Sequence, residues 1–236
     1  MLAVEDLYAG DAEEPVLSAV SLRARRGRIT GIIGPNGCGK STLLKAMVGL
    51  VPPTRGRVRF MGEDITRHSP FETLRQGLAY IPQGRQVFPD MTLLENLQMA
   101  AFSLRDERVI RERFDEAFAR FPILRERRRQ VAGTLSGGEQ SMLSFAMALI
   151  VKPSCMLLDE PSLGLSPAMV ERVFTEIVEL NEDGMTLVIV EQNIRVLLEI
   201  ADHVYILDAG RNRFDGTPAE VTGEEELMKL YMGVRA

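Results

Sequence analysis

The sequence has few cysteines and no long apolar run. Its 236 residues include only Cys38 and Cys155, too few for a disulfide-stapled secreted fold, so a reducing compartment is expected. No apolar stretch approaches the roughly 18 residues of a membrane-spanning helix. Glu5 and Asp6 stand where a signal peptide would be apolar. Any role at a membrane is therefore expected to be peripheral.

The chain also lacks an excess of positive charge. It has 28 Lys and Arg against 33 Asp and Glu, a formal net charge of −5. General nucleic-acid binders usually have a basic balance, so we expect no nucleic-acid partner. The content of 45% hydrophobic and 26% charged residues is that of an ordinary globular protein. The length fits one large domain, or two small lobes on one core.

Short apolar runs alternate with helical patterns, which predicts an α/β fold with a parallel sheet covered on both faces. The expected strands are residues 29–33, 155–158, 187–190 and 204–207. Earlier segments favour a smaller antiparallel sheet, namely residues 2–7, 20–24 and 57–60. A tight turn is expected at residues 53–56.

The sequence also predicts several helices. Residues 40–48 have an apolar stripe, and residues 167–180 follow Ser166, a candidate N-cap. Thr92 and Glu95 have the spacing of a capping box at the start of another helix.

The domain organisation follows from where strands are missing. Residues 88–150 hold helical sequence without a convincing strand. We interpret them as a helical subdomain inserted into an α/β core of about residues 1–87 and 151–236. Because no linker rich in Pro, Gly or Ser separates them, residues 1–236 are expected to form a single domain.

A glycine-rich loop joins the strand at residues 29–33 to the following helix. It consists of Gly34, Pro35, Asn36, Gly37, Cys38, Gly39, Lys40, Ser41 and Thr42. In this context the pattern G-x-x-x-x-G-K-[ST] predicts a cradle for the phosphates of a nucleotide. Backbone N–H groups and the positive end of the helix face the phosphates. Lys40 supplies a charge for the β- and γ-phosphates, and the Ser41 hydroxyl suits Mg²⁺.

Two carboxylates, Asp159 and Glu160, end another apolar strand. Ligands of parallel sheets lie beyond the carboxyl ends of the strands, so this pair is expected to face the phosphate loop. Asp159 is suited to hold Mg²⁺, directly or through water. Glu160 is then the candidate to polarise the attacking water.

A third motif precedes the apolar run at residues 142–150. It consists of Ser136, Gly137, Gly138 and Glu139. Ser136 and Glu139 have capping-box spacing. The two glycines are poor helix formers in a first turn, and we interpret them as room for a second anion at this helix N-terminus.

Together these motifs resemble the ATP-binding-cassette (ABC) family over the whole chain. The phosphate loop, Gln83, the LSGGEQ segment at residues 135–140 and the MLLDEP segment at residues 156–161 occur in that family's order. The narrower similarity is to the ATPase subunits of branched-chain amino-acid importers and their amide and urea relatives. It is supported by residues 81–89, 159–167 and 190–193.

The resemblance implies a P-loop NTPase core that hydrolyses ATP with Mg²⁺. ATP on one phosphate loop is closed by Ser136 to Glu139 of a partner, in a head-to-tail homo- or heterodimer. Gln83 senses Mg²⁺ and the γ-phosphate, and the groove near residues 83–95 docks a short helix of an integral membrane permease. The chain is then a peripheral subunit on the cytoplasmic face of the inner membrane.

Other functions remain open from the sequence. Urea or short amides are a second cargo, and lipid or polysaccharide export a third possibility. A cassette protein acting on nucleic acid is the alternative outside transport, but it usually has paired cassettes, a long coiled coil or zinc insertions, which this chain lacks.

Three positions depart from the family pattern. Gln192 stands where the family usually has a catalytic histidine, although the branched-chain importers also have glutamine. Ser166 stands where the loop after Glu160 usually has aspartate. The family's adenine-stacking aromatic residue aligns with Asp11. Tyr8, three positions earlier, is then either a substitute for it or an ordinary packing residue.

Overall fold

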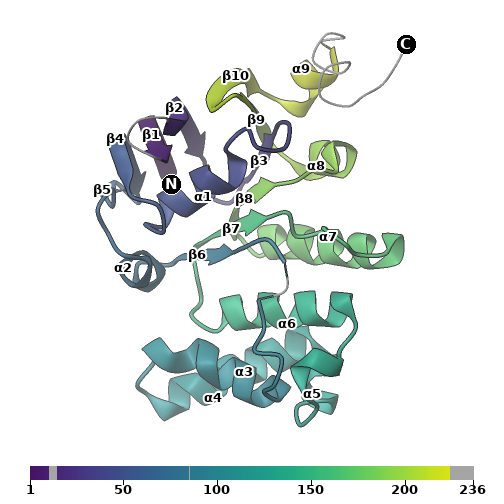
Figure 1. Ribbon diagram of the computed structural model, residues 1–236. Helices are drawn as coiled ribbons and strands as arrows, with labels where there is room; N and C mark the ends of the chain where they lie inside the picture. The colour runs from purple at the N-terminus through teal and green to yellow at the C-terminus, as the bar shows by residue number, and fades with distance from the viewer. Residues whose placement is uncertain (11–14, 85, 224–236) are drawn as a thin grey trace.

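A computed structural model describes residues 1–10, 15–84 and 86–223, in which the strands form two sheets (Figure 1). The smaller sheet is antiparallel in the order β2-β1-β4-β5. Its strands are β1 (Leu2–Gly10), β2 (Pro15–Ala24), β4 (Pro53–Phe60) and β5 (Glu63–Asp64). The expected antiparallel sheet is thus confirmed, with longer strands than predicted.

The turn expected at residues 53–56 is wrong, because these residues lie in β4. Gly56 has φ +85°, and the pairing of β1 with β4 shifts register between Glu5 and Tyr8. A bulge of this kind uses turn-forming residues inside a strand, which is why the local sequence is typical of a turn.

The larger sheet has six strands in the order β10-β9-β3-β8-β7-β6. They are β3 (Ile29–Ile33), β6 (Leu78–Ile81), β7 (Cys155–Asp159), β8 (Thr186–Val190), β9 (His203–Asp208) and β10 (Arg211–Gly216). All neighbouring strands pair in parallel except β10, which is antiparallel to β9. The four predicted strands are confirmed, whereas β6 and β10 were not predicted.

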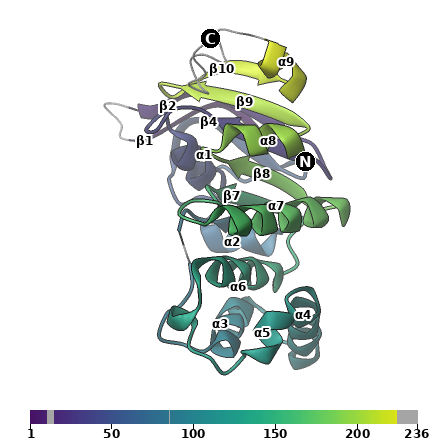
Figure 2. The same cartoon turned by 90° about the vertical axis from the view of Figure 1, so that its right-hand side faces the viewer.

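Two apolar layers cover the larger sheet. Helix α1 (Lys40–Met47) packs with residues of both sheets, while α7 (Pro167–Glu182) and α8 (Ile194–Ile200) cover the opposite face (Figure 2). In β7, Leu157 belongs to the α1 side and Leu158 to the α7 side. This alternation buries both faces of β7 and leaves its carboxyl end free to present polar side chains.

Four further helices form a group beyond β6 and β7, at the bottom of Figures 1 and 2. They are α3 (Leu93–Ala100), α4 (Glu107–Arg120), α5 (Pro122–Glu126) and α6 (Gly137–Leu149), with the 3₁₀ turns η1 (Ala101–Ser103) and η2 (Ala132–Thr134). Short helices α2 (Pro70–Arg75) and α9 (Pro218–Gly223) lie elsewhere. Among the described residues, no helix has the length and apolarity needed to cross a membrane.

Two predicted helix starts, after Thr92 and after Ser166, are present in the structure. Thr92 and Glu95 form the expected capping box before α3. Ser166 is the N-cap of α7, but its side chain makes no capping hydrogen bond. Helix α7 begins at Pro167 nonetheless, because proline is preorganised for the first helical position.

Candidate functional site

The glycine-rich loop lies between β3 and α1. Gly34, Gly37 and Gly39 all have positive φ, of 154°, 81° and 105°. A side chain at Gly34 would collide with the backbone oxygen of Leu207, and a Cβ at Gly39 would lie 2.6 Å from Leu17 Cδ2. Glycine is therefore required at Gly34 by space as well as by conformation, and the positive φ favours it at Gly39.

Lys40 begins α1 and bends back into this loop. Its ammonium donates to Gly34 O at 2.8 Å and to Pro35 O at 3.0 Å, and the residue is only 5% exposed. The loop therefore holds a cation beside the exposed backbone N–H groups of a helix N-terminus, an arrangement suited to anions. Cys38 is buried in the same loop, and burial raises the pKa of its thiol, so it packs as a neutral side chain.

Asp159 ends β7 and is 2% exposed. Its Oδ1 accepts a hydrogen bond from Ser41 Oγ at 2.9 Å, which joins β7 to the first turn of α1. Its Oδ2 accepts from the Tyr80 hydroxyl at 3.0 Å. Burial, and then the Asp159 charge, raise the pKa of Tyr80, so this hydroxyl remains a donor. Both carboxylate oxygens of Asp159 are thus held in place.

Glu160 follows with φ +50°, a strained value for a residue other than glycine. Its N–H donates to Val190 O at 2.8 Å, which fixes the strained backbone against β8. Its Oε2 accepts from Gln83 Nε2 and Gln192 Nε2, both at 2.8 Å. A carboxylate, and the amides of two separate loops, therefore meet at one point.

These groups line a common cavity of about 310 Å³. The predicted site residues in its wall are Asn36, Gly37, Gly39, Lys40, Ser41, Thr42, Gln83, Glu160 and Gln192. Gly34, Pro35 and Cys38 complete the loop behind it, and Asp159 reaches it through Ser41. The cavity thus combines an anion cradle with a carboxylate able to polarise water.

The Ser136 to Glu139 segment is not part of this wall. It opens α6 in the helical group, where Ser136 and Glu139 form a reciprocal capping box. The hydrogen bonds from Ser136 lower the pKa of Glu139, so that carboxylate stays ionised. Gly138 also has a packing reason that the sequence did not reveal, because a side chain there would collide with Met169 of α7.

The structure describes only some of the positions that depart from the family pattern. Asp11 lies outside the described residues. Tyr8 does not line the cavity, and the Arg55 guanidinium lies 5.8 Å from its ring centroid. Val16, 41% exposed, lines the cavity instead.

Two residues of the site escaped the sequence analysis. Tyr80 was missed because β6 was not predicted. Glu191 is 2% exposed, and its carboxylate accepts from the backbone N–H groups of Ser162 at 2.9 Å and Gln192 at 3.0 Å. It therefore ties the segment after Glu160 to the segment that carries Gln192. A carboxylate directly after an apolar strand was the available signal.

The fold and this cavity define a P-loop ATPase of the cassette type. Residues 17–163 match the ABC transporter family, and the chain belongs to it. It is an ATP-binding subunit that hydrolyses ATP, as the sequence predicted.

Similar proteins cover nearly the whole chain. The probable branched-chain amino acid transport ATP-binding protein LivF of Archaeoglobus fulgidus is 42% identical over 99% of both chains. The high-affinity branched-chain amino acid transport ATP-binding protein BraG of Pseudomonas aeruginosa is 39% identical over 99% of this chain and 100% of its own. The narrower similarity inferred from the sequence is thus confirmed.

Solved structures agree. A nucleotide-free ATP-binding cassette from an ABC transporter has a TM-score of 0.88 and 28% identity over 99% of both chains. A dimeric cassette in a post-hydrolysis state with ADP and phosphate has a TM-score of 0.80 and 25% identity, over 92% of this chain and 99% of that one.

Replacing Tyr80 by phenylalanine tests the bond to Asp159. We expect kcat for ATP hydrolysis to fall about tenfold at unchanged KM, because one oxygen of Asp159 loses its hydrogen-bond donor. The free energy of unfolding should fall by about 0.5–1.5 kcal/mol. Tyr205→Phe is the matched control, because that hydroxyl accepts from Arg23 N far from the site. Equal rates in the two variants would show that Tyr80 has no positioning role.

Proposed function

We propose that this chain is one of two ATPase subunits that drive a branched-chain amino-acid importer. The observation that carries the proposal is the similarity to LivF and BraG along the full chain. The names of those relatives supply the cargo, because the nucleotide site carries no information about the transported solute. Uptake of urea or amides is the runner-up from the sequence motifs.

The proposed chemistry begins with ATP on the phosphate loop. Lys40 meets the β- and γ-phosphates, and exchanges its bonds to loop carbonyls for bonds to phosphate oxygens. Ser41 and Asp159, 2.9 Å apart, offer the two oxygen ligands that Mg²⁺ usually takes from protein beside phosphate and water. Ser41 and Asp159 would hold Mg²⁺, which would neutralise phosphate charge when bound.

Glu160 is the proposed base for the attacking water. Gln83 and Gln192 hold its Oε2, which leaves Oε1 to accept a proton from water. Gln192 keeps the position of the usual histidine and can donate to the γ-phosphate, but it cannot become a cation. Gln83 also belongs to the loop that leads from β6 toward the helical group, so it can report the state of the γ-phosphate there.

The proposed site is completed by a second cassette. Ser136 and Glu139 lie outside the cavity of their own chain, as expected for a segment that closes the ATP of a partner in a head-to-tail dimer. The dimer is a homodimer or a heterodimer with a paralogue. Residues 88–150 are the proposed helical subdomain of this single domain, and they carry the segment toward the partner.

An apolar surface supports docking to an integral membrane permease. Phe71 and Phe102 are 45% and 65% exposed, and their rings lie 5.8 Å apart. Contiguous exposed apolar groups of this kind mark interaction sites. Phe88, 42% exposed, is a further exposed ring. Phe88 belongs to the segment at residues 83–95 expected to form the docking groove. The chain is then a peripheral subunit at the inner face of the membrane.

The transport proposal is tested by uptake of radiolabelled leucine in cells whose own copy is deleted. Ser136→Ala removes a contact to the partner's ATP together with a helix cap, whereas Ser69→Ala removes the same capping box at α2 only. Each substitution is expected to lower the free energy of unfolding by about 1 kcal/mol. We expect uptake to be restored by the original chain and by Ser69→Ala, but reduced at least tenfold with Ser136→Ala.

Two outcomes would contradict the proposal. Leucine uptake unaffected by the deletion would remove the cargo assignment. Equal uptake with Ser69→Ala and Ser136→Ala would remove the role of Ser136 in the composite site.

A further inference from the structure

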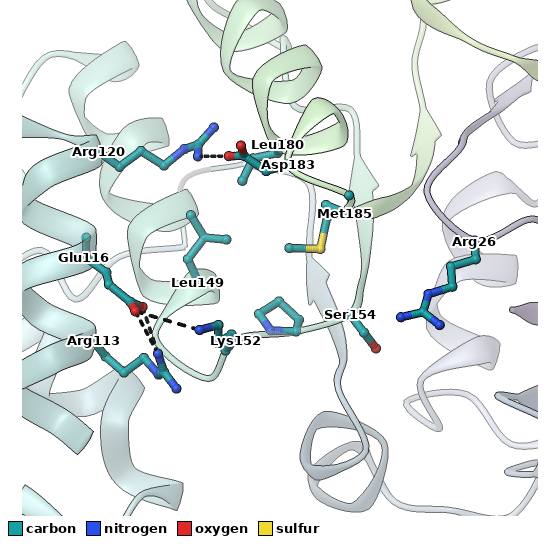
Figure 3. A pocket seen from close by; sticks show the side chains of 13 residues that line it. Arg26, Arg113, Glu116, Arg120, Leu149, Lys152, Ser154, Leu180, Asp183 and Met185 are labelled. Carbon is teal, nitrogen blue, oxygen red and sulfur yellow. Dashed lines mark hydrogen bonds and ion pairs between the residues drawn. The ribbon is translucent and has the colours of Figure 1, made fainter. Parts of the chain in front are cut away.

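A second cavity lies at the amino ends of β7 and β8, whereas the phosphate loop follows the carboxyl end of β3. Its volume is about 390 Å³, within the 300–1,000 Å³ usual for small-molecule sites (Figure 3). Its walls come from α4, the end of α6, the end of α7 and the segments that lead into β7 and β8. It therefore lies between the helical group and the α/β core.

The floor of this cavity is apolar. Ala117 and Leu180 are buried at 4% and 3% exposure. The partly buried Leu149 and Met185 also line the cavity, and their side chains point toward one another (Figure 3). Pro153 closes the side toward β7. Such a floor fits a compact aliphatic chain rather than a hydrated sugar or a bare ion.

The rim is positively charged. It has four cationic side chains against two carboxylates, Glu116 and Asp183, an excess of two positive charges. Arg120 of α4 is more than neutralised, by Asp183 at 2.7 Å, by Glu176 and by Glu179 at 3.7 Å. The positive excess is therefore local to Arg113, Lys152 and Arg26, beside the single carboxylate of Glu116.

Three cations are incompletely paired. Arg113 and Lys152 share the single carboxylate of Glu116, at 2.8 and 3.8 Å, and Arg26 has no ion pair with any described residue. The Lys152–Glu116 pair is more than half exposed on both sides, so separating it costs little. A ligand carboxylate can thus recruit Lys152 and Arg113.

We infer that this interlobe cavity binds a small carboxylate with a compact aliphatic chain. The carboxylate lies at Arg113 and Lys152, and the chain lies on Leu149, Leu180 and Met185. Free branched-chain amino acids and their α-keto acids share this chemistry. The inference is independent of the transport function proposed above, because it rests on the cavity alone.

Binding at this cavity would connect the two parts of the chain. Arg113 belongs to α4 in the helical group, whereas Met185 and Arg26 belong to the core. The Arg120–Asp183 ion pair already joins α4 to the end of α7 beside the cavity. A bound carboxylate adds a second bridge across the same junction.

Calorimetric titration of the purified full chain tests the site. The probes are 4-methyl-2-oxopentanoate and L-leucine, with acetate as the head group alone and 3-methylbutylamine as the tail alone. We expect saturable binding of at least one of the first two at about 0.1–1 mM, reasonable for ligands of this size, and none of the latter two. Absence of binding by both main probes at about 10 mM overturns the inference.

Three substitutions locate the binding. Arg113→Gln and Lys152→Gln should each weaken it about tenfold. Arg111→Gln, on the same helix but outside the cavity, should leave it unchanged. Equal affinity in all three variants places the ligand elsewhere and overturns the inference. Lys152 is 67% exposed, so its replacement keeps the test valid if Arg113→Gln fails to fold.

A fourth substitution distinguishes binding of the amino acid from binding of the α-keto acid. Glu116→Gln should weaken the amino acid if its ammonium uses that carboxylate, and should strengthen the keto acid by freeing two cations. An unchanged affinity of both ligands in this variant, at the rim of the cavity, counts against the site.

Discussion

Glu160→Gln is expected to lower the rate of ATP hydrolysis by about 10²–10⁴, the usual contribution of a general base. The substitution is nearly isosteric. Its amide oxygen can still accept from Gln83 and Gln192, which both bond a single oxygen of Glu160. What disappears is the negative charge that polarises water. Nucleotide affinity should stay within about threefold of that of the original chain. A dimer should accumulate in the presence of ATP, because the bound ATP is not hydrolysed.

This result is measured as phosphate release and as the dimer fraction in sizing experiments with ATP. Glu171→Gln, an exposed position on α7, is the control for a lost carboxylate. Hydrolysis that persists at the original rate in Glu160→Gln would show that another group activates the water. Hydrolysis lost together with nucleotide binding would instead indicate a damaged phosphate loop.

Lys40→Met is expected to weaken ATP binding about a hundredfold or more, because a buried, charge-assisted contact to phosphate disappears. The methionine stem retains the packing of a side chain that is only 5% exposed. Two loop carbonyls, Gly34 O and Pro35 O, lose their donor but lie next to the cavity, where water can replace it.

The control for this variant is Lys45→Met, which removes the same charge from the last turn of the same helix. Titration with ATP should separate the two variants clearly. Similar affinities in both would mean that the backbone N–H groups alone hold the phosphates. Thermal unfolding without nucleotide should show little difference between them.

The sequence was informative where local chemistry determines structure. The strand at Ile29–Ile33, the phosphate loop and the capping boxes at Thr92 and Ser136 each need residue types that no other local structure favours. The same reasoning failed at residues 53–56, where a bulge in β4 uses the residues of a turn.

Long-range packing accounts for what the sequence could not reveal. Strand β6 is only four residues long, and its pairing with β7 depends on residues 77 positions away along the chain. Tyr80 therefore gave no sign of its bond to Asp159. Gly138 likewise has a packing partner, Met169, on another helix. The Glu160 carboxylate accepts hydrogen bonds from Gln83 and Gln192, and the three loops that carry these residues meet only after folding.

The helical group is inserted between β6 and β7, two adjacent parallel strands. One connection leaves the carboxyl end of β6 beside Gln83, and the other returns at the amino end of β7 beside Pro153. The two connections are therefore separated by about the length of β7, roughly 16 Å, along the strands. Under the role proposed for Gln83, a change at the γ-phosphate enters the helical group at the carboxyl edge of the sheet, whereas the group is joined to the core again at the amino edge.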